Sequence, residues 1–393
     1  MIVRSLGWLL LGFPVALVVY TYGLYPLLLR FMARVRPPTS LTSAANPIVS
    51  IVVPAYNEEI QIRGAIEALL AQDYPADRRQ ILILSDASTD GTDAIVREYA
   101  DRGVELLRMP VRGGKTAAEN ASCAMLRGEL IVNTDSSTRL HPAAVRRLVE
   151  AMADPTVGVA STCDVSVTRD AATANAAEAG YVGYEMRIRE LETLTGGIVG
   201  ASGSGYAIRA LLHRLPVRED LSRDFSAALT ARTHGYTAVS VSDALCFVPR
   251  TTSLKSEYKR KVRTMARGIE TLLHNRHLLN PREYGAFSWK LVSHKICRWL
   301  VPPSAIVGAL GLLLLAASYT WATVLLALGM LLGGTALAGS RWPASRPIPR
   351  LLSLVTFSVA ANVAVVHAIF RVLHGHEDHL WEPTRRTPPI LGG

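Results

Sequence analysis

The chain has 393 residues, of which 49% are hydrophobic, and its net charge is +10. No basic stripe with interleaved aromatic residues is present, so nucleic acid is excluded as the expected partner of this charge, and anionic lipid or a phosphate-bearing substrate accounts for it better. The cysteines lack the paired spacing of a metal site, and we expect buried thiols at Cys123, Cys163, Cys246 and Cys297.

The N-terminal end predicts a retained membrane anchor. Residues Leu6 to Leu29 carry no charge, and a run of this length can span a bilayer core of about 30 Å. Arg30, Arg34 and Arg36 follow the run, so the positive-inside rule places the next residues in the cytoplasm. We therefore expect residues 1–36 to form a transmembrane helix and its flank.

The middle of the chain predicts an α/β domain after a linker rich in Pro, Ser and Thr at residues 36–47. Strands alternate with helices, which is typical of a parallel sheet with right-handed crossovers. Ligands bind such sheets beyond the carboxyl ends of the strands. The expected strands are Ile48–Val53, Gln80–Leu84, Val104–Arg108 and Glu129–Asn133, and the expected helices are Ile60–Ala71, Thr92–Asp101 and Lys115–Leu126.

The C-terminal end predicts three more transmembrane helices within residues 301–371. The apolar runs are Val301–Ser318, Tyr319–Ala338 and Leu351–Phe370. Arg341, Arg346 and Arg350 place the loop before the last run in the cytoplasm, so the tail at residues 372–393, with Glu377, Asp378 and Glu382, is expected outside the cell.

The segment at residues 282–300 predicts an amphipathic helix that lies on the membrane surface. It combines Trp289 and Trp299 with Lys290, Lys295 and Arg298, a mixture that settles at the boundary between lipid and water. This helix would hold the middle domain against the bilayer, where a lipid-linked or exported acceptor is met.

Three motifs in the middle domain resemble those of family 2 glycosyltransferases with the GT-A fold. The first is similar to the family's opening motif, the second to its DDGSTDGT loop and the third to its GK…LN element. They are Pro54-Ala55-Tyr56-Asn57-Glu58-Glu59, Ser85-Asp86-Ala87-Ser88-Thr89-Asp90-Gly91-Thr92, and Arg112-Gly113-Gly114-Lys115 running on to Asn120.

The resemblance covers about Ile48 to Leu273, and the flanking apolar runs are similar to the membrane-bound branch with the cellulose, chitin and hyaluronan synthases. It implies an α/β GT-A domain, Rossmann-like and nucleotide-sugar-binding, at residues 47–275, joined to a helical transmembrane region. The implied location is the cell (inner or plasma) membrane, multi-pass, with the catalytic domain in the cytoplasm.

The resemblance implies a donor site at the strand ends. Tyr56 offers a flat wall for the base, and Asp86 an acceptor for ring or ribose donors. Turn or helix-cap duty is the alternative for Asp86 and Asp90, because Asp favours both positions. Lys115 begins a helix, where a cation is unfavourable unless an anion binds nearby, and the alternative there is a solvated lysine. The implied donor-binding residues are Ala55, Tyr56, Glu58, Asp86, Lys115 and Asp135.

Asp135 is also the implied metal ligand. At this place the family has a D-x-D pair that contacts ribose and a divalent cation on the donor diphosphate, whereas this sequence reads Asp135-Ser136-Ser137. One carboxylate, phosphate oxygens and water can hold Mg²⁺, which usually keeps several waters, so the expected cofactor is Mg²⁺ or Mn²⁺. A loop-capping Asp is the alternative.

The later part of the domain resembles the family's acceptor side. The segment Gly200 to Gly205 is similar to a glycine-rich segment of the family, which implies acceptor binding at Ser202 and Gly203, with a flexible loop as the alternative. Upstream, Tyr184, Glu185 and Glu192 resemble positions on a family helix beneath the acceptor site, where amphipathic packing is the alternative.

Ser222-Arg223-Asp224-Phe225 lies where relatives carry T-E-D, which implies that Asp224 is the catalytic general base. A single such carboxylate suffices for inversion, because the sugar is displaced in one step. Arg223 stands in place of an acid, and we expect that it can pair with Asp224 and lower the pKa of that carboxyl. A surface ion pair is the alternative.

Residues 259–268 match the family's Q-x-x-R-W region in part. Arg260, Arg263 and Arg267 fall on one face of a helix and would repel one another unless anions meet them, so a departing diphosphate is the expected partner. A helix lying on anionic lipid is the alternative. Thr264 stands where the motif's Trp would be, which speaks against long-polymer synthesis.

These features predict an inverting glycosyltransferase that moves a sugar from a UDP-type nucleotide donor to a growing glycan or a lipid-linked acceptor, with polysaccharide synthesis as one form of that reaction. A polyprenyl-phosphate glycosyltransferase is one alternative. A catalytically silent glycosyltransferase-like subunit is the other, because Ser85, Ser137 and Arg223 each replace an acid. A homo-oligomer is compatible with the small number of spans.

Overall fold

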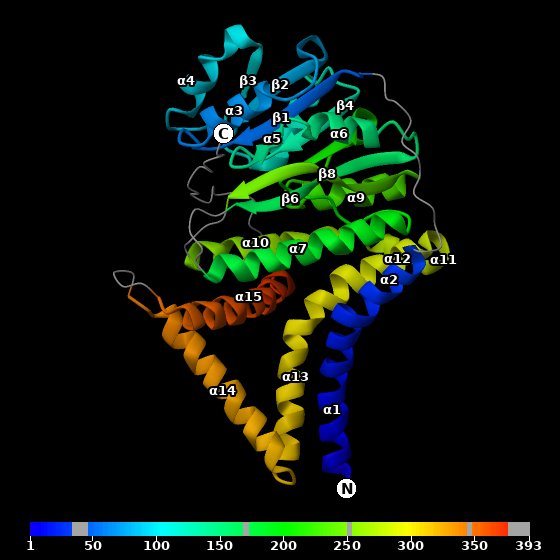
Figure 1. Cartoon of the computed structure of the whole chain (residues 1–393), viewed down its shortest axis with the longest axis vertical. Helices are drawn as coiled ribbons and strands as arrows, with labels where there is room; N and C mark the ends of the chain where they lie inside the picture. Colours follow the sequence, from blue (N-terminus) through cyan, green and yellow to red (C-terminus); the bar gives the residue numbers. More distant parts are fainter. Residues whose placement is uncertain (34–45, 168–172, 250–253, 344–347, 376–393) are drawn as a thin grey trace.

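The structure, a computed structural model, describes residues 1–33, 46–167, 173–249, 254–343 and 348–375. Most of the expected linker at residues 36–47 lies outside the described residues, as do Arg34, Arg36 and Arg346 and the acidic residues of the expected tail. An α/β domain occupies the upper end of the molecule in the view of Figure 1, and long apolar helices extend from its underside.

One mixed sheet of eight strands runs through the described part of the domain, in the order β3-β2-β1-β4-β7-β6-β8-β5. The first four strands are mutually parallel, which confirms that part of the sequence prediction. The rest of the sheet is not wholly parallel: β7 is antiparallel to both of its neighbours, and β5 is antiparallel to β8. The strands are β1 (Val49–Ala55), β2 (Arg79–Ser85), β3 (Val104–Arg108), β4 (Leu130–Thr134), β5 (Arg139–Leu140), β6 (Val157–Val167), β7 (Gly205–Arg209) and β8 (Thr237–Pro249).

Helices cover both faces of the sheet. Successive side chains of a strand point to opposite faces, and β1 carries apolar side chains on both. Ile51 and Val53 of β1 pack with α3, α4 and α6 on one face, whereas Val52 packs with α5, α8 and α9 on the other. The helices of the domain are α3 (Ile62–Leu70), α4 (Thr92–Arg97), α5 (Lys115–Ser122), α6 (Ala144–Ala151), α7 (Thr173–Leu194), α8 (Ala210–His213), α9 (Arg223–Thr233) and α10 (Leu254–His274).

Within the described residues, four helical segments are long and apolar enough to cross a membrane: Ile2–Ala33, Ala286–Ala316, Thr320–Ser340 and Arg350–Leu373. The first comprises α1 (Ile2–Val19), a π-helical turn (Tyr20–Leu24) and α2 (Tyr25–Ala33). The rest follow α11 (Pro281–Tyr284) and are α12 (Ala286–Leu291), a π-helical turn (Val292–Cys297), α13 (Arg298–Ala316), α14 (Thr320–Ser340) and α15 (Arg350–Leu373).

The N-terminal helix lies side by side with α13 (Figure 1). A Cβ at Gly311 would lie 2.7 Å from the Leu11 nitrogen and 2.8 Å from the Gly7 oxygen. Glycine at this position therefore allows the two backbones to approach closely, as is common between membrane helices.

The segment expected to be a separate surface helix is instead continuous with α13. One helical segment runs from Ala286 to Ala316 without a break. Ser288, Lys290 and His294 are each at most 2% exposed, because this part of the segment packs under the domain. Protein contacts, rather than lipid head groups, surround these side chains.

Helix α15 lies crosswise to α13, directly beneath α10 and α7 (Figure 1). Tyr258 of α10 hydrogen bonds with Nδ1 of His367 of α15 at 3.0 Å, and Lys261 lies over the ring of Phe357. A third C-terminal span was expected from length and hydropathy, yet this direction suits a helix that lies along the membrane surface.

The direction of α15 predicts the side of the membrane on which the C-terminus lies. A reporter fused to the C-terminus is expected to lie on the same side of the membrane as the α/β domain, opposite to the side expected from flanking charges. Paired fluorescent-protein and alkaline-phosphatase fusions in a bacterial host measure this directly. A fusion in the hairpin between α13 and α14 is the matched control, expected on the far side; phosphatase activity of the C-terminal fusion would contradict the prediction.

Candidate functional site

A cavity of about 400 Å³, here called the first cavity, brings together residues from both halves of the domain. It collects most of the side chains predicted from the sequence, although they come from segments far apart in the chain. Ala55, Tyr56 and Asp86 are not in its lining and lie instead at the ends of β1 and β2. The predicted residues that line it are Glu58, Lys115, Asp135, Ser202, Gly203, Asp224, Arg260, Arg263 and Arg267.

Lys115 and Asp135 form an ion pair on the donor side of this cavity, with Nζ 2.6 Å from Oδ1. Burial acts to lower the pKa of Lys115, but Asp135, Glu119 and Asp224 outweigh it and hold that pKa above its usual range. The lysine therefore stays cationic at the start of α5, a fixed positive charge that a donor phosphate can meet.

Asp86 positions the loop that leads into Lys115. Its carboxylate is buried and accepts hydrogen bonds from the backbone amides of Gly113 at 2.7 Å and Gly114 at 2.8 Å. Gly114 has a φ of 88°, which favours glycine. The turn-type role left open for Asp86 is therefore present in the structure, and contact with the donor stays a prediction. Asp90 caps its turn by accepting from the Thr92 amide at 3.0 Å.

The ring of Tyr56 carries a stacked guanidinium. The Arg112 Cζ atom lies 3.8 Å from the ring centroid, a cation–π contact on one face of the ring that was expected to receive the donor base. Base stacking at Tyr56 thus requires either the other face of the ring or a movement of Arg112.

The residues at Asp135 fit a divalent cation that the donor diphosphate largely holds. Among the described residues no group of three or more His, Cys, Asp or Glu is placed to bind a metal. Oδ1 of Asp135 pairs with Lys115, while Oδ2 can serve as one ligand, the remainder coming from phosphate oxygens and water.

Asp135→Ala is expected to remove the gain in nucleotide affinity that Mn²⁺ brings, about tenfold or more. Titration calorimetry with nucleoside diphosphate, with and without Mn²⁺, measures it. Asp135→Asn keeps the shape but not the charge and is expected to behave in the same way. Asp77→Ala, at a side chain that is 81% exposed, is the control; Mn²⁺-dependent binding that survives in Asp135→Ala would refute the metal assignment.

Asp224 lies in the first turn of α9, where a carboxylate is stabilised by the helix N-terminus. Ser222, the residue that precedes the helix, donates its hydroxyl to Oδ1 of Asp224 at 2.5 Å. A Cβ at Gly203 would lie 2.9 Å from Oδ2, so the glycine leaves room for the carboxylate. The glycine-rich segment and the segment around Asp224, both identified from the sequence, therefore meet in this cavity.

Gly203→Ala is expected to lower kcat by roughly tenfold to a hundredfold, because the added methyl group displaces the Asp224 carboxylate. Nucleotide affinity is expected to stay the same, since the donor side is untouched. Gly183→Ala, in α7 where a Cβ meets nothing within 4 Å, is the matched control. A kcat of the Gly203 variant equal to that of wild type would show that this contact is not needed.

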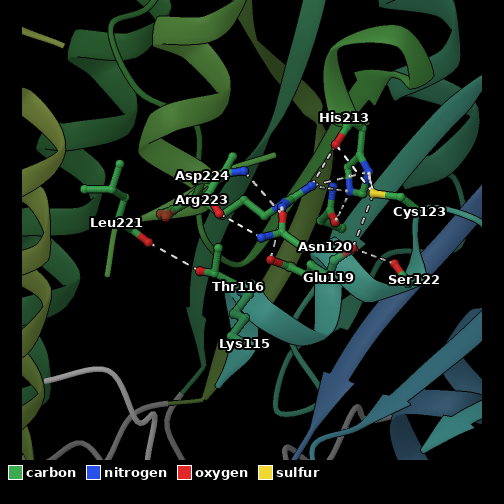
Figure 2. Close-up of polar contacts among 12 residues, drawn as sticks. Lys115, Thr116, Glu119, Asn120, Ser122, Cys123, His213, Leu221, Arg223 and Asp224 are labelled. Atoms are coloured by element: carbon green, nitrogen blue, oxygen red, sulfur yellow. Dashed lines mark hydrogen bonds and ion pairs between the residues drawn. The ribbon is translucent and has the colours of Figure 1, made fainter. Parts of the chain in front are cut away.

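Arg223 does not pair with Asp224, which corrects the expectation from the sequence (Figure 2). Its guanidinium points the other way, donating to the His213 carbonyl at 2.8 Å and to Oδ1 of Asn120. Its Nε lies 3.6 Å from Oε2 of Glu119, which is fully buried. The acid missing at position 223 is thus replaced by an arginine with its own buried counter-charge on α5.

The three arginines of α10 have different surroundings. Arg267 donates to the backbone carbonyls of Asp220, Glu219 and Leu221, so it holds the loop that leads to Asp224. Arg260 pairs with Glu257 one turn away on the same helix. Binding of the departing diphosphate stays a prediction for all three, and Arg267 has a structural role as well.

Several residues of the site were not identified from the sequence. Asp164, on β6, lines the first cavity and accepts a hydrogen bond from the Ser202 hydroxyl at 2.6 Å. Glu119 lies on α5, near the cavity, and Lys295 lies in the segment that was predicted to be a surface helix. The positions of both depend on tertiary contacts, and no sequence signal sets Lys295 apart from the neighbouring Lys290 and Arg298.

A buried ionic network joins the underside of the domain to the apolar helices. His294 lies between Oε1 of Glu192, 2.8 Å from Nδ1, and Oε1 of Glu185, 3.1 Å from Nε2. Tyr25 of α2 donates to Glu192, and Arg298 pairs with Glu185 at 2.6 Å. Burial acts to raise the pKa of Glu185, but His294 and Arg298 outweigh it and hold that pKa well below its usual range. The α7 carboxylates therefore serve as ionised anchors for three other segments.

Comparisons with known proteins agree with this architecture. A β-monoglucosyldiacylglycerol synthase of Synechocystis sp. is 28% identical over 176 residues, which cover 43% of this chain and 37% of that protein. A dolichyl-phosphate β-glucosyltransferase of Trichomonas vaginalis is 36% identical over 104 residues, 23% of this chain and 31% of that protein. The chain thus spans about a third of the length of these curated relatives.

Among solved structures, a mannosyltransferase from Pyrobaculum calidifontis in complex with GDP-Man and Mn²⁺ has the same fold. The TM-score is 0.72 at 23% identity, with 94% of this chain and 100% of that chain covered. The sequence matches Glycosyl transferase family 2 over residues 50–209 and Glycosyl transferase family group 2 over residues 130–338, more than half of the chain. The protein therefore belongs to the family 2 glycosyltransferases and has a GT-A fold.

Proposed function

We propose that the protein is an inverting glycosyltransferase of the cell membrane that moves a sugar from a nucleotide sugar to a hydroxyl group of a lipid-linked acceptor or a growing glycan. Its catalytic domain would face the cytoplasm. The observation that carries the proposal is the first cavity, in which Asp224 faces the same space as the Lys115–Asp135 pair.

The chemistry follows from these groups. Asp224 takes the proton of the acceptor hydroxyl as its oxygen attacks the anomeric carbon. The bond from that carbon to the diphosphate oxygen breaks, and its electron pair leaves with the nucleoside diphosphate. Because displacement occurs in one step, the anomeric configuration inverts.

Charge on the leaving diphosphate is the main electrostatic demand of this reaction. Lys115 provides a fixed cation, and Arg260 and Arg263 line the same cavity. A bound Mg²⁺ or Mn²⁺ would supply further positive charge at Asp135. The Mn²⁺ in the P. calidifontis structure supports this assignment.

The type of donor base and the length of the product are proposed from the sequence motifs. A UDP-type donor is proposed from the motifs, although the P. calidifontis structure holds GDP-Man, so both nucleotides belong in any test. Thr264 lines the first cavity at the position of the motif's Trp, which favours transfer of one or a few sugars over polymer synthesis.

Transfer to a polyprenyl phosphate is the second candidate, supported by the dolichyl-phosphate β-glucosyltransferase among the relatives. In that reaction the nucleophile is a phosphate oxygen without a proton to remove. A general base would then be unnecessary, whereas the first candidate gives the Asp224 carboxylate in the cavity a proton to remove.

The test uses the purified full chain with Mn²⁺, a panel of UDP- and GDP-sugars and a membrane lipid extract. We expect one donor to be consumed with release of its nucleoside diphosphate, and the product to have the inverted anomeric configuration by NMR. No turnover of any donor, or a product with retained configuration, would overturn the proposal.

A further inference from the structure

A second cavity, of about 350 Å³, opens from the first toward the apolar helices. Asp224, Ser222, Arg189 and Lys295 line both cavities, so the two are continuous at the catalytic carboxylate. The remaining walls of the second cavity come from α10, α13 and α15. A molecule in it would therefore extend from Asp224 to the helices that are apolar enough to span a membrane.

The lining of the second cavity has an excess of positive charge. It contains four basic side chains against two carboxylates: Arg189, Lys261, Lys295 and Arg298 against Glu185 and Asp224. Glu185 is already shared between Arg189 at 3.2 Å and Arg298 at 2.6 Å, in addition to its contact with His294.

Lys295 is the cation of this group that lacks a counter-charge. Among the described residues its ammonium makes no hydrogen bond or ion pair; it lies 5.2 Å from the ring centroid of Phe225, the residue after Asp224. The neighbouring Lys290, by contrast, donates to the Gly197 carbonyl at 2.6 Å. A half-buried ammonium that has no ion-pair partner among the described residues is stabilised by an anion in the cavity, so the site is arranged for an anionic ligand.

The lining also has a large apolar part. It comprises Phe357, Ala361 and Val365 of α15, Pro302 of α13 and Met265 of α10, with the polar Ser358 and Asn362 among them. A ligand that fits both the cations and the apolar side chains carries a compact anion on a hydrocarbon chain. The hydrocarbon would leave between α13 and α15, while the anion would remain beside Lys295.

We propose that the second cavity is the acceptor site, that the acceptor is a lipid with a phosphate group apart from its attacking hydroxyl, and that Lys295 binds this phosphate group. This inference rests on the proposed function, since a lipid in this cavity is an acceptor only if the protein transfers a sugar. It adds the class of acceptor and the residue that recognises it. The donor diphosphate belongs on the opposite side of Asp224, at Lys115 and Asp135 in the first cavity.

The test compares binding of farnesyl phosphate and farnesol, which share one hydrocarbon chain, to the purified full chain in detergent. Wild type is expected to bind farnesyl phosphate roughly tenfold or more tightly than farnesol, because a charge-assisted contact is lost in the alcohol. Lys295→Met is expected to bind both equally, and Lys295→Arg to keep the preference. Ala361→Trp, which fills the apolar part of the cavity, is expected to weaken both.

Lys259→Met, at an exposed lysine of α10 outside both cavities, is the control for loss of one positive charge. Affinity for nucleoside diphosphate with Mn²⁺ is expected to be the same in wild type and Lys295→Met. Nucleotide binding also reports whether Lys295→Met is folded. If Lys295→Met does not fold, the binding of the two ligands to Lys295→Arg and Ala361→Trp tests the proposal.

The proposal is overturned if wild type does not discriminate between the two ligands, or if Lys295→Met retains the preference. It is also overturned if Lys295→Met weakens nucleotide binding while Lys295→Arg and Ala361→Trp leave it unchanged, because Lys295 would then serve the donor. Inorganic phosphate that competes fully at the same concentration would show an anion site without a lipid component, again against the proposal. Absence of sugar transfer in wild type, with lipid-phosphate binding intact, would count against the proposed function alone.

Discussion

Asp224→Asn is expected to lower kcat by roughly 10²–10⁴-fold, the usual contribution of a general base. The amide has the shape of the carboxylate, so it fits beside Gly203 and next to the Ser222 hydroxyl, but it accepts no proton from the acceptor. Affinity for the nucleotide sugar is expected to change little, because Lys115 and Asp135 remain in place. Initial rates of nucleoside diphosphate release with saturating acceptor measure kcat.

Asp220→Asn is the matched control for Asp224→Asn. Asp220 lies in the loop that precedes α9, pairs with Arg218 at 2.7 Å and does not line either cavity. Its variant is expected to keep the wild-type rate. An Asp224→Asn enzyme that retains more than a tenth of wild-type kcat would indicate that no proton is removed by this residue, as in transfer to a phosphate oxygen.

Arg223→Met is expected to lower the free energy of unfolding by about 3–5 kcal/mol, because it leaves the buried Glu119 carboxylate without its counter-charge. Both carboxylate oxygens of Glu119 already lack a hydrogen-bond partner among the described residues, so no hydrogen bond from those residues replaces the lost ion pair. In Glu119→Leu/Arg223→Met both charges are gone, and most of the stability is expected to return. Thermal unfolding in detergent, followed by tryptophan fluorescence, compares the three proteins.

The pH dependence gives an independent check on this pair. Burial raises the pKa of Glu119, and the nearby Lys115 and Arg223 offset only part of that rise. An acid whose pKa is higher in the folded state stabilises the fold less as the pH rises from the unfolded pKa through the folded one. Removal of Arg223 raises the folded pKa further, so the deficit of Arg223→Met is expected to shrink as the pH falls through that range.

An equal deficit at every pH, or no recovery in the double variant, would contradict the Glu119–Arg223 assignment. Loss of the Arg223 bonds to Asn120 and His213 would then explain the instability. Arg147→Met, at an exposed arginine that pairs with Glu150, is the matched control and is expected to change the stability by less than about 1 kcal/mol.

The first four strands and the helices between them were predictable because a buried parallel strand is a short apolar run and its crossover helix has its own period. The strands β6, β7 and β8 were not, because β7 pairs antiparallel between β4 and β6, and such pairing joins residues distant in the chain. The motifs also predicted that Lys115, Asp135, Gly203 and Asp224 would converge on one site. They did not predict where Arg223 points, since that depends on a buried acid on a different helix.

Length and hydropathy predicted four apolar helices but not their directions. Nothing in the composition of α15 indicates that it lies crosswise beneath α10, because its direction depends on contacts such as Tyr258 with His367. Lys295 was assigned to a lipid-facing surface for the same reason: the burial of the segment 286–300 is a tertiary property.

The unbroken helical segment from Ala286 to Ala316 joins the floor of the catalytic domain to the helix pair of α1 and α13. Tilting of that pair is therefore passed on to the domain through a continuous helix. When the bilayer is thinner or thicker than the apolar length of the two helices, the helices change their tilt to match it in part. The height of Asp224 above the lipid is thereby coupled to bilayer thickness, and lipid chain length becomes a determinant of which acceptor groups reach the base.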